Sequence, residues 1–115
     1  MRLFLYFWSK LFKKIRASAI RNSFIHKSST IESGSLIVNS SMDRHSFCGY
    51  NCEITNANIG SFCSIANGVI IGGGMHPLDW ISTSPAFYSG RDSIKAKFSA
   101  HDREAPKKVT IEHDV

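Results

Sequence analysis

Residues 25–75 decide the fold, because their apolar residues recur at a fixed spacing. Written in lines of 17 residues that start at 25, 42 and 59, this stretch reads IHKSSTIESGSLIVNSS, MDRHSFCGYNCEITNAN and IGSFCSIANGVIIGGGM. Aliphatic or sulfur-containing residues, here called anchors, recur in steps of five or six residues. The anchors are Ile25, Ile31, Ile37, Met42, Cys48, Ile54, Ile59, Ile65 and Ile71. An ordinary amphipathic strand has a period of two and does not produce this spacing.

A three-sided coil explains the repeat. Each side is a short strand with its corner, so one turn takes about eighteen residues, and every anchor points inward. The fourth residue after each anchor also points inward and is usually small: Ser29, Ser35, Ser41, Ser46, Cys52, Asn58, Cys63, Val69 and Met75. We expect the tight corner at the residue after each anchor, which is often glycine or acidic, as at Gly49 and Asp43. The prediction is an all-β solenoid, a parallel β-helix. Antiparallel hairpins are disfavoured, because the turn pair Asn67-Gly68 falls inside the repeat.

The three cysteines fit the interior of this coil. Cys48 is an anchor, whereas Cys52 and Cys63 occupy small inward positions, where free cysteine packs like a small apolar residue. An odd number of cysteines without a secretory signal argues against a disulfide framework and indicates a reducing, cytoplasmic setting. We do not expect Cys63 to act as a nucleophile, because a buried thiol without a positive neighbour stays protonated.

Residues 1–21 are expected to form a basic amphipathic helix. Apolar and aromatic side chains from Leu3 to Ile15 follow the helical i, i+3, i+4 pattern, with lysines on the other side. Residues 1–27 hold seven of the 14 Lys and Arg residues and none of the nine acidic ones, so the rest of the chain is slightly acidic. That distribution argues against nucleic-acid binding by the body of the protein. Two interpretations stay open: residues 1–16 contact a membrane surface, or they cap the end of the solenoid.

The repeat breaks after Gly72-Gly73-Gly74-Met75, at His76. We expect at least two of the glycines to serve a tight exit from the coil. A loop excursion spans 76–108, and the repeat resumes over 109–115 with Ile111 as anchor, so the predicted β-helix domain is 22–115. Because the chain stops within a repeat, we expect further C-terminal coils to be missing from it.

The quoted residues resemble a known enzyme family. IGSFCSIANGVIIGGGMHPLDWISTSPAFYS, residues 59–89, and KKVTIEHDV, residues 107–115, are similar to hexapeptide-repeat acetyltransferases of the xenobiotic and polysaccharide O-acetyltransferase-like branch. The resemblance implies a left-handed parallel β-helix, a homotrimer with active sites between subunits, acetyl-CoA as co-substrate and a hydroxyl-bearing acceptor. It also implies that much of the CoA-binding surface lies beyond residue 115, so the cofactor-binding residues are not identified.

The resemblance places the catalytic base at His76. An imidazole suits this role, because its ordinary pKa lies near neutral pH. Asp79, Trp80 and Tyr88 are candidates for binding the acceptor. Asp79 is equally compatible with a loop-surface acid, and the aromatic residues, together with Phe87, are compatible with anchoring the excursion. No metal site is expected.

Other functions remain open on the sequence alone. The leading hypothesis is O-acetylation of a sugar in surface-polysaccharide or lipopolysaccharide synthesis, with antibiotic O-acetylation as the alternative. The chain could also be an inactive truncated fragment that only assembles with other subunits. A zinc carbonic anhydrase on a similar helix would need three converging histidines. His45, His76, His101 and His113 do not follow that pattern, and we expect His101 and His113 to be solvated.

Overall fold

The computed structural model describes residues 1–74, 82–87, 89–90, 92–99, 101–102 and 105–115. The chain begins with one helix, α1 (Arg2–Ile15), and continues as short strands. The strands are β1 (Ala19–Arg21), β2 (Phe24–Ile25), β3 (Thr30–Ile31), β4 (Leu36–Val38), β5 (Ser41–Met42), β6 (Phe47–Cys48), β7 (Glu53–Thr55), β8 (Ala57–Ile59), β9 (Ser64–Ile65), β10 (Ile70–Ile71) and β11 (Val109–Ile111). A single 3₁₀ turn, η1 (Pro85–Phe87), is described between β10 and β11.

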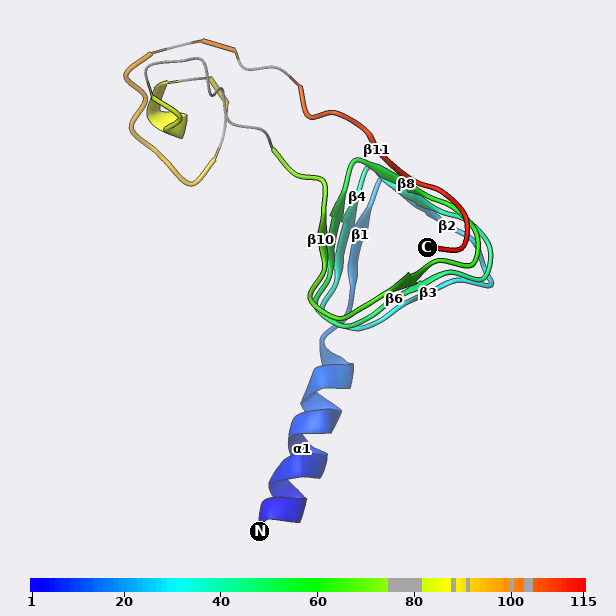
Figure 1. The fold of residues 1–115 in the computed structure, drawn as a ribbon. Helices are drawn as coiled ribbons and strands as arrows, with labels where there is room; N and C mark the ends of the chain where they lie inside the picture. Colours follow the sequence, from blue (N-terminus) through cyan, green and yellow to red (C-terminus); the bar gives the residue numbers. More distant parts are fainter. Residues whose placement is uncertain (75–81, 88, 91, 100, 103–104) are drawn as a thin grey trace. The chain divides into compact units, whose positions relative to one another are not determined.

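The strands form three parallel sheets, which Figure 1 shows as the sides of a triangle. Their orders are β1-β4-β7-β10, β11-β8-β5-β2 and β3-β6-β9. Each strand pairs in parallel with the strand one coil away, as Ile37 does with Ile54 and Cys48 does with Ile65. The predicted fold class, an all-β solenoid with an N-terminal helix, is confirmed. Its coils of 17 residues are consistent with a left-handed β-helix.

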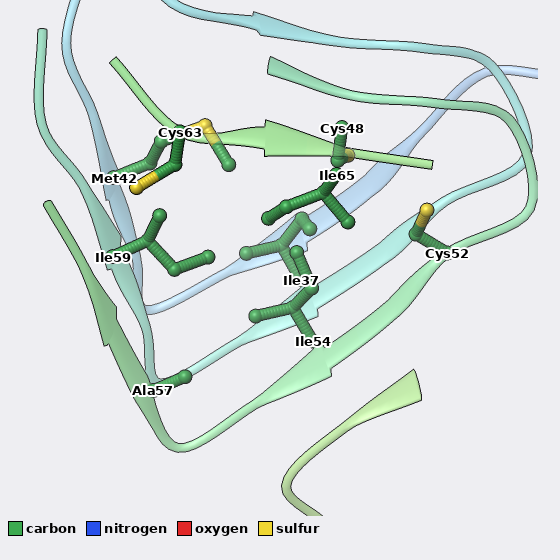
Figure 2. Packing of buried hydrophobic residues seen from close by; sticks show 9 residues of the cluster. All are labelled: Ile37, Met42, Cys48, Cys52, Ile54, Ala57, Ile59, Cys63 and Ile65. Atoms are coloured by element: carbon green, nitrogen blue, oxygen red, sulfur yellow. The ribbon is translucent and has the colours of Figure 1, made fainter. Parts of the chain in front are cut away.

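The anchors fill the space between the three walls. Ile37, Met42, Cys48 and Ile54 are at most 1% exposed, and they belong to one cluster with Ile59 and Ile65. Figure 2 shows these side chains converging from all three sheets on the axis of the coil. Burying each such side chain contributes about 1.5–3 kcal/mol relative to leaving it in water. The stack of anchors is therefore the hydrophobic core of the solenoid.

The small inward residues form hydrogen-bonded columns from coil to coil. The Ser46 hydroxyl donates to the carbonyl of Gly60 at 2.7 Å and accepts the Cys63 backbone N–H at 3.0 Å. Ser35 makes the equivalent bonds, donating to the Gly49 carbonyl and accepting the Cys52 N–H. These side chains satisfy buried backbone groups next to the corners, where no strand partner is available.

Among the described residues, two of the predicted inward positions are wrong; Met75 lies outside the described residues. Ser41 and Asn58 point outward, where the Ser41 hydroxyl donates to the Asn58 side-chain oxygen at 2.9 Å. The residues before them, Ser40 and Ala57, are the buried ones. The reason is that these sides of the coil are one residue shorter, so the inward position comes three residues after the anchor, not four.

The corners also lie later than predicted. In the solenoid, apart from Gly72 at the exit, left-handed backbone angles occur two or three residues after an anchor, in three columns of equivalent positions. These columns are Asn22, Asn39, Asn56 and Gly73; Gly34, Asn51 and Gly68; and His45, Phe62 and Asp114. Glycine and asparagine tolerate this conformation best, which explains their frequency in the columns. Glycine directly after an anchor serves a close approach instead: a Cβ at Gly49 would lie 2.0 Å from the Asn67 side-chain oxygen.

The solenoid begins earlier than the sequence analysis placed it. The helix ends at Ile15, and residues 19–21, which we assigned to the helix segment, form β1 and pair with β4. Ile20 lies in register with Ile37. It is therefore an anchor that precedes Ile25, the first anchor identified from the sequence. The described chain divides into two compact units, the solenoid with its helix (Met1–Gly73 and Lys107–Val115) and the excursion (Gly74–Pro106).

Candidate active site

The chain leaves the solenoid directly after β10, through Gly72 and Gly73. Both have positive φ angles, +78° and +110°. A Cβ at Gly72 would lie 1.9 Å from the carbonyl oxygen of Thr55, the residue below it in the preceding coil. Neither position could hold an ordinary side chain without strain, and only Gly72 also faces a steric clash. This geometry supports the interpretation that the two glycines serve a tight exit.

The predicted site residues follow this exit. His76, Asp79, Trp80 and Tyr88 all lie outside the described residues, so their predicted roles remain predictions. The structure describes the solenoid up to the glycine exit that precedes these residues. It describes the solenoid again where the chain returns to it. Val109 pairs with Ala57 and Ile111 with Ile59, so β11 continues the sheet of β2, β5 and β8. Val109–Ile111 thus pair in register at the place where the repeat was expected to resume.

The described part of the excursion is held together by its own contacts. The Phe98 N–H donates to the carbonyl of Ala86 at 2.7 Å, and Ala86 is 7% exposed. The ring of Phe98 lies 6.0 Å from that of Phe87. The Lys97 ammonium donates to the Pro85 carbonyl and forms an ion pair with Asp92 at 2.7 Å. Phe87 therefore packs within the excursion, and this contact does not decide between anchoring the excursion and binding the acceptor.

The sheet that β11 rejoins carries a groove on its outer face. Its volume is 420 Å³, and Ser41, Asn58 and Thr110 contribute hydroxyl and amide groups to its lining. Asp43 and His113 also line the groove. The sequence analysis missed this feature because it placed Ser41 and Asn58 inside the coil. The five-residue step from Ile37 to Met42 could have indicated their outward direction.

The histidines of the solenoid have structural contacts. The His113 side chain is exposed, as expected, and its Nδ1 atom also accepts the Ser61 backbone N–H at 2.8 Å. The ring of His45 stacks on Phe62, with 5.2 Å between centroids. Over the part of the chain that is described, no three His, Cys, Asp or Glu side chains gather in a metal-binding arrangement.

The carboxylate of Asp43 has a lowered pKa. The main cause is the backbone N–H of Arg44, which donates to Asp43 Oδ1 at 2.8 Å, with smaller contributions from Ser61, the Arg44 charge and His113. The group is fully exposed, so this shift indicates a local turn contact and not a desolvated catalytic acid.

The three cysteines are free and buried, as predicted. Burial raises the pKa of the Cys48 thiol, which keeps it protonated. The Sγ atoms of Cys52 and Cys63 donate to the carbonyls of Ala66 and Glu112, at 3.1 and 3.0 Å. These thiols therefore take the structural place that serine hydroxyls hold in the other coils.

Comparisons with protein-family models, with curated proteins and with solved structures find no match to this chain.

Proposed function

We propose that the protein is an acetyl-CoA-dependent O-acetyltransferase of the hexapeptide-repeat kind. The observation that carries the proposal is the combination of a 17-residue parallel solenoid with one excursion, which begins at a glycine exit and returns in register at β11. The stretch from residue 59 to residue 89 resembles the same family at the same place. Insertions in solenoids emerge on one face, which is often the binding face.

In the proposed reaction, His76 is the general base. Its neutral imidazole accepts the proton of the acceptor hydroxyl while that oxygen attacks the acetyl carbonyl. A new C–O bond forms and the C–S bond of the thioester breaks. The imidazolium then returns its proton to the departing sulfur, so the products are an O-acetyl ester and CoA. Holding both substrates together makes the attack effectively unimolecular.

The remaining predicted residues would bind the acceptor. Trp80 and Tyr88 offer flat apolar surfaces with a polar edge, which suit a sugar ring, and Asp79 would accept hydrogen bonds from its hydroxyls. A homotrimer would complete the site between subunits. Leu36 and Ile70 lie in the same outer column, on either side of Glu53, and are 40% and 70% exposed, so this wall offers apolar surface that such an assembly would cover.

The preferred acceptor is a sugar of a surface polysaccharide or lipopolysaccharide precursor. An antibiotic hydroxyl is the alternative acceptor, and the residues at hand fit both. The two acceptors differ in size and in attachment to lipid, so direct assays separate them.

The experiment is a measurement of CoA release by the purified chain. The chain is incubated with acetyl-CoA and, in separate reactions, with nucleotide-linked or lipid-linked sugars and with hydroxyl-bearing antibiotics, while free thiol is followed with a chromogenic disulfide. We expect release that depends on one acceptor class and a product heavier by one acetyl group. Absence of acceptor-dependent release with every class would contradict acetyl transfer by this chain and favour the alternative of an inactive subunit that only assembles with others.

A further inference from the structure

Helix α1 carries an apolar face that the described chain leaves uncovered. Leu3, Phe4, Phe7 and Ile15 are 60–68% exposed, and no residue of the helix is buried. Its aromatic side chains contact one another, with Trp8 stacked on Phe4 at 6.0 Å and edge-on to Phe12 at 5.0 Å. So large an exposed apolar surface is unusual on a soluble domain and marks an interaction site.

The rest of the helix is basic. Arg2, Lys10, Lys13 and Lys14 lie on it, Arg16 follows it, and residues 1–27 contain no acidic residue. The helix segment contacts the coil through its polar groups. The Lys13 ammonium lies 4.3 Å from the centre of the Tyr50 ring, and the carbonyl of Lys14 accepts the Ser33 hydroxyl at 3.3 Å. The apolar face is therefore not what holds the helix to the solenoid, which argues against a capping role.

We infer that α1 lies in the surface of an anionic phospholipid membrane. Trp and Phe on an apolar face with lysines beside it form the composition that partitions into the headgroup boundary. A second copy of the helix is a poor occupant, because it would bring two clusters of positive charge together without any acid. Anionic headgroups supply the missing negative charge.

The length of the helix sets how it would bind. Fourteen residues at about 1.5 Å each give about 21 Å, shorter than the roughly 30 Å hydrocarbon layer. Among the described residues, no helix is long and apolar enough to cross a bilayer. The helix would thus lie parallel to the surface. This inference is independent of the proposed acetyl transfer, although it would bring the solenoid to any lipid-linked acceptor.

The experiment is co-sedimentation of the full chain with vesicles of phosphatidylcholine alone or mixed with phosphatidylglycerol, at low and high salt. We expect binding to the mixed vesicles, weakened by salt. Replacing Lys10, Lys13 and Lys14 by Gln should weaken binding about fivefold per charge removed. Phe4→Ser with Phe7→Ser should weaken it about tenfold or more. Phe62→Ser is the matched control, because Phe62 is 60% exposed on the solenoid, and it should bind like the parent chain.

Tryptophan emission identifies the inserted segment. A blue shift on adding mixed vesicles should persist in Trp80→Phe and disappear in Trp8→Phe. The inference is overturned if the folded chain does not bind mixed vesicles, or if it binds neutral and anionic vesicles equally. It is also overturned if Phe4→Ser with Phe7→Ser binds unchanged. A lower molecular mass in that double variant without vesicle binding by the parent chain would assign the face to self-association instead.

Discussion

The interior of the coil depends on small polar residues as much as on isoleucines. The Ser46 side chain bridges two coils by donating to Gly60 and accepting from Cys63. Cys52 and Cys63 donate through their thiols in equivalent positions. A small side chain that donates through a hydroxyl or a thiol therefore fits this inward position. This explains why the column contains both serine and cysteine.

We predict that Ser46→Ala destabilises the solenoid by about 1–3 kcal/mol, because it leaves the buried Cys63 N–H and the Gly60 carbonyl without a partner. Ser46→Cys should lose less, since a thiol occupies the same place in the neighbouring coil. The control is Ser64→Ala on the exposed outer face of β9, expected within about 0.5 kcal/mol of the parent. Urea unfolding followed by circular dichroism provides the comparison. Equal losses for Ser46→Ala and Ser64→Ala would argue against the column.

Gly68 and Gly72 have nearly the same φ angle, so alanine substitutions at the two positions separate the cost of backbone strain from the cost of a steric clash. Gly68 has a φ of +71° and open space around its missing Cβ, whereas a Cβ at Gly72 meets the Thr55 carbonyl. We predict that Gly68→Ala costs about 1–2 kcal/mol, from the left-handed conformation alone. Gly72→Ala should cost clearly more, about 4 kcal/mol, and shift the exit of the chain. Denaturant midpoints measure both values, and a Gly72→Ala loss no greater than that of Gly68→Ala would contradict the described approach to Thr55.

At the level of elements, the anchor spacing predicted most of the strands. All nine anchors from Ile25 to Ile71 lie in short strands of the three walls, because each side needs a large apolar side chain at one fixed inward position. The sequence analysis missed the first strand, β1. Its signal was available in a recurring pattern, Ile20-x-Asn22, Ile37-x-Asn39 and Ile54-x-Asn56, in which the asparagine takes the left-handed corner.

The boundary of the helix was harder to predict. Propensity and amphipathicity do not separate the last helical turn from the first strand when both are apolar and basic, as in Ile15-Arg16-Ala17-Ser18-Ala19-Ile20. Pairing of Ala19 with Leu36 decides the matter, and that contact between segments 17 residues apart is not local information. Strand pairing overrides the local preference here.

We predict that removing residues 1–15 leaves the stability of the solenoid within about 1 kcal/mol of the full chain. No residue of α1 is buried, and its contacts with the coil are polar and exposed. Arg16 is retained because its carbonyl accepts the Gly34 N–H. Thermal unfolding of both chains gives the comparison. A large drop in the melting temperature of the shortened chain would restore the capping interpretation.

For the whole molecule, the architecture of the solenoid could be predicted from the sequence. For the candidate site, only its position along the chain could be predicted. The repeat fixed where the coil stops, at the triple glycine, and where it resumes, at Ile111. The predicted catalytic and acceptor-binding residues follow the exit in a segment without a repeat, so periodicity gives no geometry for them. Their predicted roles come from a resemblance in the order of residues, because the packing of a periodic repeat gives no information about them.

The most direct test of the account compares acetyl transfer by the parent chain with that by His76→Ala. A general base contributes about 100-fold or more to the rate, so we predict a loss of kcat of that size with the solenoid still folded. His101→Ala, a change in the same excursion, is the control and should retain most of the rate. Full activity of the His76→Ala protein would contradict the proposed mechanism.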